Sequence, residues 1–315
     1  MKRTLVLLAA VLASSLLSGR AAGQAQSLFP PARSGFAGGS GSGAVGGHKL
    51  VLIAGKPSHP PGQHEFRAGA LLLQKCLAGV PGLQVNVYTN GWPDTDSAFD
   101  GASAVVIYSD GGGGHPALQG AHAVLLRGLI EKGVGFGVMH YACEVPKDKG
   151  GPEFLSWVGG YYEDRYSCNP MWSPDYRAFP EHPLTRGLKP FTIRDEWYFN
   201  LRWRPEMKGI TPILVAKPSD AVRDGPYVWP AGPYSHIQAN KGRDEVMMWV
   251  ANGPAGGPAF GFTGGHFHQN WGDENFRRVV LNALLWVAGV EVPADGVAST
   301  VTAGELQQNL DVKQK

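Results

Sequence analysis

Seven short apolar runs, rich in β-branched and aromatic residues, limit the possible folds of this chain more than any other feature. They are continuous rather than alternating, and they lie at residues 50–54, 85–88, 104–108, 134–139, 212–216, 246–250 and 259–263. A strand without regular polar positions is typically buried on both faces, as in a parallel sheet that helices cover. The runs therefore predict the strands of one such sheet.

Helical patterns separate several of these runs. Apolar residues follow helical spacing at Phe66, Ala70, Leu73 and Leu77, at Leu118, Leu125 and Leu129, and at Phe276, Val279, Val280, Ala283, Leu284 and Val287. The last of these helices begins with Asp273 and Glu274, whose charges suit a helix N-terminus. Strands that alternate with helices predict an α/β fold with a doubly wound, mostly parallel sheet and right-handed crossovers.

Residues 151–203 interrupt this alternation, because they are dense in Trp, Tyr, Pro and charged residues. We interpret them as an aromatic-rich insertion over the cleft rather than as a second domain. Residues 48–302 are long enough for one sizeable core and do not require two. The sequence therefore predicts a single domain over residues 48–302, followed by a C-terminal tail at residues 303–315.

The first 47 residues have the composition of an export signal and a linker. Lys2 and Arg3 precede an apolar run at residues 5–17, and small residues follow it, as in a secretory signal peptide over residues 1–25. The run is too short to span a bilayer, so we expect no stable membrane insertion. Residues 26–47 are rich in Gly, Ser, Pro and Ala and predict a flexible linker. The expected location of the mature protein is the periplasm or the exterior of the cell.

Charge and cysteine content exclude some functions. The formal net charge is +2, and three basic residues (Lys2, Arg3, Arg20) leave with the signal, so the mature chain carries about −1. Nucleic acid is therefore not an expected partner. Three cysteines cannot all pair within one chain, and their spacing matches no zinc-binding motif. A disulfide between Cys143 and Cys168 stays open at this point.

Histidines collect directly after the predicted strands. Six of the ten histidines do so: His59, His64, His115, His140, His266 and His268. Ligands bind outside the carboxyl ends of parallel strands, where the loops surround a crevice and helix N-termini point. We therefore predict that His64, Asp110, His140 and His266 converge on one pocket.

His140 has a special position in this set. Residues 135–142 read as a strand that turns directly into a helix, the setting in which hydrolases expose a nucleophile. The exposed position carries His140 rather than Ser or Cys, which argues against a Cys-nucleophile amidotransferase. Cys143 lies close by, and we interpret it as a small buried residue. His140 is thus a candidate general acid or base, or a metal ligand.

Two pairs of residues have spacings that suit metal ligands. His140 and Glu144 stand four residues apart and share one face if the turn is helical. His266 and His268 flank Phe267, so their side chains point the same way in an extended segment. We therefore expect His140, His266 and His268 to bind zinc or another divalent ion. The alternative is that these histidines hydrogen-bond within the core or bind substrate hydroxyls, since no His-x-x-x-His spacing accompanies them.

A glycine turn and an acidic-aromatic segment complete the candidate site. The four glycines at residues 111–114 are not followed by Gly-Lys-Ser/Thr, so we expect no nucleotide cofactor and predict close backbone approach to a substrate. Residues 195–198 combine carboxylates with aromatic rings, a combination that binds sugars. The predicted substrate-binding residues are His59, His64, Asp110, Tyr141, Asp195, Trp197 and Tyr198. The predicted catalytic residues are His140, Glu196 and Glu144.

Several ordered motifs resemble those of one known family. They are Gly-Lys-Pro-Ser-His at 55–59, Tyr-Ser-Asp-Gly-Gly at 108–112, His-Tyr-Ala at 140–142, Trp-Val-Gly-Gly-Tyr-Tyr-Glu at 157–163, Asp-Glu-Trp-Tyr at 195–198 and Gly-Phe-Thr-Gly-Gly-His-Phe-His at 261–268. From about Lys49 to the end of the last helix, the chain resembles the ThuA-like, or trehalose-utilisation, family. The resemblance implies a class I glutamine-amidotransferase-like, flavodoxin-type fold that lacks the amidotransferase cysteine. It also implies that His140 occupies the place of the amidotransferase nucleophile.

The resemblance further implies a link to bacterial sugar catabolism, particularly of 3-keto-disaccharides. Our hypothesis is a hydrolase or isomerase that acts on an oxidised (3-keto) sugar or glycoside, with a divalent metal polarising a carbonyl or hydroxyl. In this hypothesis His140 and Glu196 perform acid/base chemistry. The alternative is a non-catalytic sugar-binding protein that uses the same cleft. An amidase would need a nucleophile that the sequence does not offer, and the oligomeric state stays open.

Overall fold

A seven-stranded sheet forms the centre of the protein in a computed structural model that describes residues 47–313. Its strands are β1 (His48–Ala54), β2 (Leu83–Tyr88), β3 (Ala102–Tyr108), β4 (Gly135–Met139), β11 (Ile210–Ala216), β12 (Glu245–Asn252) and β13 (Pro258–Phe262). Each strand coincides with one of the seven apolar runs. The predicted signal peptide and all but the last residue of the predicted linker lie outside the described residues.

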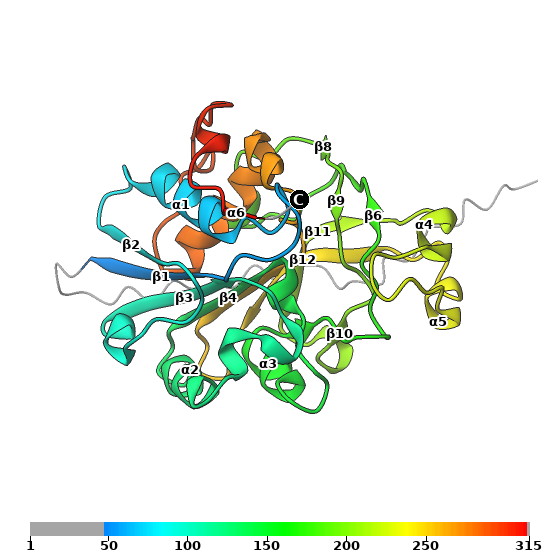
Figure 1. Ribbon diagram of the computed structural model, residues 1–315, viewed down its shortest axis with the longest axis horizontal. Helices are drawn as coiled ribbons and strands as arrows, with labels where there is room; N and C mark the ends of the chain where they lie inside the picture. The colour runs from blue at the N-terminus through cyan, green and yellow to red at the C-terminus, as the bar shows by residue number, and fades with distance from the viewer. Residues whose placement is uncertain (1–46, 314–315) are drawn as a thin grey trace, which may run out of the picture. The chain divides into compact units, whose positions relative to one another are not determined.

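The strand order explains where a site can form. The sheet runs β11-β12-β13-β4-β3-β1-β2, and β1, β2, β3, β4 and β13 pair in parallel (Figure 1). The partial order β2-β1-β3-β4-β13 is that of flavodoxin-like sheets. β12 pairs antiparallel with both of its neighbours. The predicted doubly wound, mostly parallel α/β fold is therefore confirmed.

Helices cover both faces of the sheet (Figure 1). α1 (Phe66–Leu77) and α6 (Glu274–Val287) contact each other on one face, and α2 (His122–Ile130) and α3 (Gly151–Trp157) lie on the other. The α6 helix begins where the Asp273 side chain accepts a hydrogen bond from the Phe276 amide, and its apolar face packs into the core. The predicted first and last helices are confirmed. Leu118 lies outside α2, because Pro116 starts a separate 3₁₀ turn there.

Residues 151–203 fold onto the sheet as part of the same domain. They form α3 and short antiparallel strand pairs: β5 (Gly160–Tyr161) with β10 (Arg202–Trp203), β6 (Met171–Trp172) with β9 (Asp195–Glu196), and β7 (Asp175–Tyr176) with β8 (Phe191–Thr192). Tyr176, Trp197 and Phe199 from this segment are buried in the same hydrophobic cluster as the strands and α6. The segment is therefore an insertion and not a second domain.

The remaining helices are short. They are α4 (Asp220–Asp224), α5 (Ser235–Gln238), and the 3₁₀ helices η1 (Asp96–Phe99), η2 (Gly112–Gly114), η3 (Pro116–Leu118), η4 (His140–Cys143), η5 (Pro183–Thr185), η6 (Pro205–Met207), η7 (His268–Gly272) and η8 (Glu305–Gln307). Within residues 47–313, none of the helices has the length and apolar character needed to cross a membrane. Cys143 and Cys168 are buried free thiols, so the structure contains no disulfide between them.

Candidate active site

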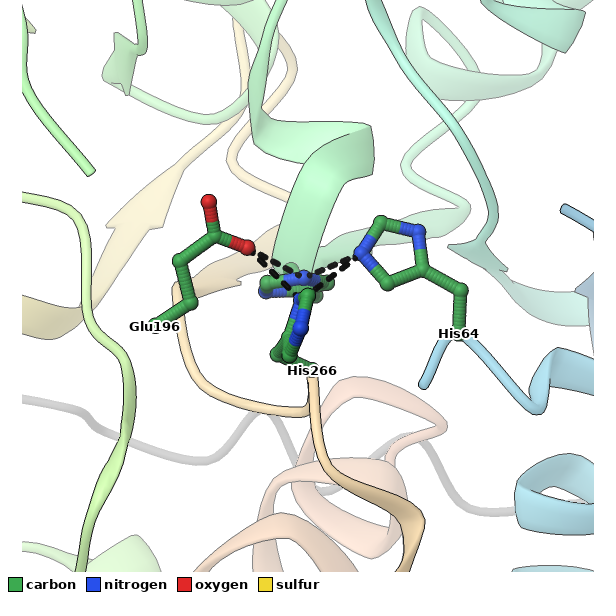
Figure 2. Close-up of side chains that lie close together, drawn as sticks. His64, Glu196 and His266 are labelled. Atoms are coloured by element: carbon green, nitrogen blue, oxygen red, sulfur yellow. Dashed lines mark hydrogen bonds and ion pairs between the residues drawn. The ribbon is translucent and has the colours of Figure 1, made fainter. Parts of the chain in front are cut away.

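Three histidines and one glutamate from distant parts of the chain meet at the carboxyl edge of the sheet. Figure 2 shows His64, His266 and Glu196 pointing toward one another. His64 Nε2 lies 3.0 Å from both His140 Nε2 and His266 Nδ1. Glu196 Oε2 lies 2.7 Å from His266 Nδ1 and 3.5 Å from His140 Nε2. We call these four residues the histidine–glutamate cluster.

His140 enters the cluster through an unusual backbone conformation. It is the first residue after β4 and has a φ of 56°. This left-handed value is uncommon for residues other than glycine and is typical of the sharp strand-to-helix turn at a hydrolase nucleophile. The ring is 0% exposed, so the prediction of an exposed His140 is wrong. Its Nδ1 donates to the carbonyl oxygen of Thr263 at 2.9 Å, which turns Nε2 toward the other histidines.

His64 is oriented by a carboxylate. Its Nδ1 lies 2.9 Å from Asp110 Oδ1, which follows β3, so Nδ1 carries the hydrogen and Nε2 faces the cluster. A carboxylate behind a histidine fixes the tautomer in the way that metal sites use. His59 stacks on the outer face of His64 with ring centroids 3.6 Å apart. His64, Asp110, His140 and His266 therefore come together at one edge of the sheet, as predicted, and His64 is the one of the four that lines the cavity described below.

The insertion positions the other half of the cluster. The carboxylate of Asp195 accepts hydrogen bonds from the backbone amides of Gly265 and His266 at 2.8 and 3.1 Å, and from that of Phe267 at 3.3 Å. These bonds hold the loop after β13 that carries His266. Glu196 accepts a hydrogen bond on Oε1 from Asn169 Nδ2 at 2.8 Å, which leaves Oε2 free to face the histidines.

Burial sets the charge of the cluster. It lowers the pKa of His64 and of His140 well below the ordinary value, and it lowers that of His266 to about 4, so all three rings are neutral near pH 7. Burial also raises the pKa of Glu196 to about 8, so this carboxyl group is protonated near pH 7 and would release its proton on binding a cation. The hydrogen bonds of His64 and His140 on Nδ1 leave a lone pair on each Nε2, and these two nitrogens lie 3.0 Å apart. Two facing lone pairs repel each other unless a cation lies between them.

The cluster has the dimensions of a metal site. Its four ligand atoms all lie within 4.8 Å of one another. A tetrahedral zinc ion with bonds of about 2.0–2.1 Å to nitrogen requires ligand atoms about 3.3 Å apart. The measured separations of 2.7–3.5 Å bracket that value. Neutral imidazole and carboxylate are suitable ligands for zinc, manganese or nickel. The four residues therefore fit a divalent ion in number, chemistry and spacing.

A cavity of about 870 Å³ opens beside the cluster. Its lining includes His59, His64, Tyr141, Glu144, Glu196 and Tyr198 from the predicted site, together with Gly111, Gly112, Gly113, Gly114, Val145, Pro146, Lys147, Glu163, Asp164, Asn169, Val228 and Trp229. Such a volume lies near the upper end of the ~300–1,000 Å³ that small-molecule sites occupy. The histidine–glutamate cluster therefore faces a cavity that is large enough for a small-molecule substrate.

One family of known proteins has a model that matches most of this chain. The family model described as "ThuA: Trehalose utilisation" matches residues 51–287, which is most of the chain and includes every residue of the cluster. The chain belongs to the ThuA family. Membership in this family points to a role in carbohydrate catabolism. No curated protein matches the sequence.

Two solved structures share the fold of this ThuA-family protein. A ThuA-like protein from Bacteroides uniformis is 17% identical with a TM-score of 0.54, and the match covers 79% of this chain and 94% of that one. A ThuA-like protein from Parabacteroides merdae is 15% identical with a TM-score of 0.53, and the match covers 82% of this chain and 94% of that one. At such low identity these similarities establish the ThuA-like fold alone.

The geometry corrects the prediction for His268. The chain leaves the extended conformation after Phe267 and enters η7, so the alternation of side chains ends and the ring does not join His266. The His268 amide instead donates to the Gly62 carbonyl at 3.0 Å, and its buried ring lies in the field of Glu65. The metal-ligand prediction is therefore wrong for His268, and Glu196 takes its place in the cluster.

Glu144 lines the cavity, but it does not share a helix face with His140 as predicted. η4 covers only four residues, and Glu144 follows it in an extended conformation, so the expected shared helix face with His140 does not exist. The carboxyl group lies beside Gly112 and Tyr141 on the cavity wall instead. Burial raises the pKa of Glu144 to about 8, with further contributions from Asp164 and Glu196. The group therefore keeps its proton at neutral pH.

Two predicted substrate-binding residues are buried outside the cavity lining. Trp197 packs against Phe262 and Phe276, and its Nε1 donates to the Ile193 carbonyl. Asp195 accepts hydrogen bonds from the backbone amides of Glu196, Gly265, His266 and Phe267, and it serves to position the loop after β13. The substrate-binding prediction is therefore wrong for both residues, because Trp197 fills the core and Asp195 satisfies the amides of a buried loop.

The glycine turn after β3 lines the cavity with all four of its glycines, Gly111 to Gly114, so close backbone approach to a substrate stays a prediction. A Cβ at Gly111 would collide with the carbonyl oxygen of Tyr141, so this glycine also permits close approach to the backbone of η4. His115 is buried and lies 3.1 Å from the Ala142 carbonyl, which makes it a support for η4.

Six further residues belong to the site although no sequence pattern predicted them there. They are Asn169, which orients Glu196, and the cavity residues Lys147, Glu163, Asp164, Val228 and Trp229. Asn169 stands in an irregular part of the insertion, where neither strand nor helix spacing marks a residue. Trp229 lies in the loop between α4 and α5 and carries no recognisable motif. The one sequence feature that marks Trp229 is a tryptophan within a loop that is rich in Gly and Pro.

Proposed function

We propose that this ThuA-family protein is a metal-dependent enzyme, a hydrolase or isomerase that acts on an oxidised (3-keto) sugar or glycoside. The observation that carries the proposal is the convergence of three neutral imidazoles and one carboxyl group beside a cavity that His64 and Glu196 line. Asp110, the Thr263 carbonyl and Asn169 orient the side chains of His64, His140 and Glu196, and Asp195 holds the backbone amide of His266. The ion would polarise a carbonyl or hydroxyl oxygen of the sugar. His64, His140, His266 and Glu196 would hold it.

The cluster also leaves access for a substrate. His64 and Glu196 belong both to the cluster and to the lining of the cavity, so one side of the ligand set faces that cavity. An ion held by the four residues would meet a substrate oxygen from that side and would polarise it there. In this proposal His140 and Glu196 act as metal ligands and not as the acid/base pair that the sequence favoured.

Glu144 is the group that can exchange a proton with the substrate. It lines the cavity, and its pKa of about 8 keeps it protonated at neutral pH while allowing it to ionise close by. Tyr141 lies next to it, and burial and the nearby carboxylates raise the pKa of its hydroxyl. Glu144 therefore serves as general acid, and Tyr141 as a neutral hydrogen-bond donor to the substrate.

The rim of the cavity supports a carbohydrate substrate. The Trp229 side chain is 75% exposed and shares the cavity lining with Glu163, Asp164 and Lys147. An exposed indole above polar side chains offers an apolar face for a sugar ring and hydrogen-bonding groups for its hydroxyls. Because Asn169 Oδ1 accepts the Trp229 amide while its Nδ2 holds Glu196, one side chain links the rim to the cluster.

Export is part of the same proposal. The basic start, apolar run and small residues of the first 25 positions support secretion or periplasmic location of the mature protein. Amino-terminal sequencing of protein isolated from the producing cells should give a start at Gln24 or Gln26. A mature chain that still begins at Met1 would refute export.

The decisive experiment combines metal analysis with an activity assay. Mature protein purified without a metal-affinity tag should contain zinc, manganese or nickel in near-stoichiometric amount. It should convert members of a panel of 3-keto-glycosides, lose this activity after chelation and regain it when the metal is returned. Absence of metal together with unchanged activity in chelator would refute the metal-dependent mechanism. Tight sugar binding without turnover would favour the non-catalytic sugar-binding alternative.

A further inference from the structure

A buried ion pair joins the C-terminal segment to the loop that carries His64. Lys313 Nζ lies 3.2 Å from Glu65 Oε1, and the two side chains are 4% and 1% exposed. The residues are 248 positions apart in the sequence. Glu65 directly follows the cluster residue His64 and precedes α1. The C-terminal segment up to Lys313 is therefore anchored behind the candidate active site.

The contacts of this pair fix the backbone around His64. Lys313 Nζ donates to the carbonyl oxygens of both Gln63 and His64, the latter at 3.2 Å. Glu65 Oε1 accepts the Gly62 amide, and Oε2 accepts the Asp311 amide, both at 2.9 Å. The two side chains thus tie residues before and after His64 to one another and to the C-terminal segment.

The local backbone explains why such fixation matters. His64 has a φ of 46°, a left-handed conformation that costs free energy in a residue with a Cβ and persists only where the surroundings enforce it. This conformation sends the imidazole into the cluster while its amide donates to the His266 carbonyl. A buried ion pair adds little net stability compared with apolar residues of similar size. The effect of the Lys313–Glu65 ion pair is instead to fix the position of His64.

We propose that Lys313 and Glu65 are positioning residues that hold His64 in its metal-binding orientation. The inference rests on the metal site proposed above. Neither side chain lines the cavity or belongs to the cluster, so their effect on the chemistry is indirect. The C-terminal segment is accordingly a functional part of the site and not a dispensable tail.

The test compares two lysines that anchor the same segment. Lys75 Nζ contacts Glu305 Oε1 at 2.7 Å on the surface, away from His64, and provides a matched control. Zn²⁺ affinity is measured by competition with a chromophoric chelator for the wild-type protein, Lys313→Met and Lys75→Met. Loss of a group that orients a metal ligand typically weakens binding about 10–100-fold, and we expect this for Lys313→Met. Lys75→Met should stay within about twofold of wild type, as for other exposed ion pairs.

A second variant separates positioning from the effect of an unpaired buried charge. Glu65→Gln combined with Lys313→Met removes both charges, so folding is not opposed by a lone buried carboxylate. The double variant should still bind Zn²⁺ at least about tenfold more weakly, and its Co²⁺ complex should have an altered visible absorption spectrum. Wild-type Zn²⁺ affinity and Co²⁺ spectrum in this variant would overturn the positioning role and leave the metal site intact. Failure of the wild-type protein itself to bind Zn²⁺ would instead refute the proposed metal site.

Discussion

The two halves of the histidine–glutamate cluster are built in different ways. His64, His140 and His266 stand in loops that directly follow strands of the parallel sheet, so the sheet brings them together. Glu196 comes from the short strand β9 of the insertion, where it is held by Asn169 rather than by the sheet. The sheet therefore supplies the neutral ligands, whereas the insertion supplies the carboxyl group and part of the cavity wall.

The sheet therefore provides the rigid scaffold of the proposed metal site, and the insertion provides groups that select the ion and the substrate. Ligands at the ends of buried strands lie on rigid elements, and any chain with this topology can bring such residues together. The insertion adds the carboxyl group of Glu196, which would ionise on binding a divalent cation, and part of the polar rim that a substrate meets. The predictions below test how far each half contributes, beginning with the largest expected effect.

Replacement of a sheet-borne ligand should have the largest effect. His140→Gln removes one imidazole ligand from the cluster but keeps a polar side chain, so we expect loss of bound metal and a fall in turnover that exceeds the ~10–100-fold caused by losing a partner behind a ligand. Metal content and kcat measure this directly. His268→Gln is the matched control, because His268 lies outside the cluster, and it should retain both. Equal turnover of His140→Gln and wild type would remove the sheet half from the mechanism.

Glu144 tests both halves together, because it follows β4 and η4 of the sheet side while Asp164 of the insertion helps to raise its pKa. As a general acid with a pKa of about 8, it is protonated below that pH, so kcat should be constant at lower pH and fall as the pH rises through about 8. Glu144→Gln should lower kcat about 10²-fold and abolish this fall. Asp164 of the insertion raises the pKa of Glu144, so Asp164→Asn should move the fall to lower pH. A kcat that rises through pH 8 would contradict the acid role.

Asn169 tests the insertion alone. Asn169→Ala leaves all four cluster residues in place but removes the hydrogen bond that orients the Glu196 carboxylate. Metal affinity should fall about 10–100-fold, the usual effect of losing a partner behind a ligand. Titration with Zn²⁺ measures the change. Unaltered affinity would mean that the insertion supplies Glu196 without having to orient it.

Trp229 should show the smallest effect of the four. Removal of an exposed ring at the rim reduces binding of the sugar without touching the cluster, so Trp229→Ala should raise KM about tenfold and leave kcat nearly unchanged. Steady-state kinetics on a glycoside substrate separates the two constants. Val124→Ala, at an exposed apolar residue outside the cavity lining, is the control. A fall in kcat with constant KM would contradict a role limited to substrate binding.

The sequence by itself determined the sheet and the meeting of its histidines. Runs such as those in β1 and β4 are apolar on both faces, and a sheet that helices cover on both faces buries them. Parallel strands end at the same edge, so residues that follow them, such as His64 and His140, must lie close together. Both conclusions rest on periodicity and order, which a sequence contains in full. The ThuA-like resemblance agrees with the family match.

Only the tertiary structure decided which side chains face the cavity. His268 follows His266 by two residues, yet a turn into η7 sends its ring elsewhere, and Glu144 is extended where a helix was expected. Trp197 packs into the core. Asn169 contacts Glu196, which is 27 positions away, and Lys313 contacts His64, which is 249 positions away. Side-chain direction beyond a strand end depends on a few local torsions and on long-range hydrogen bonds. Neither leaves a periodic trace in the sequence, so the folded chain alone fixes them.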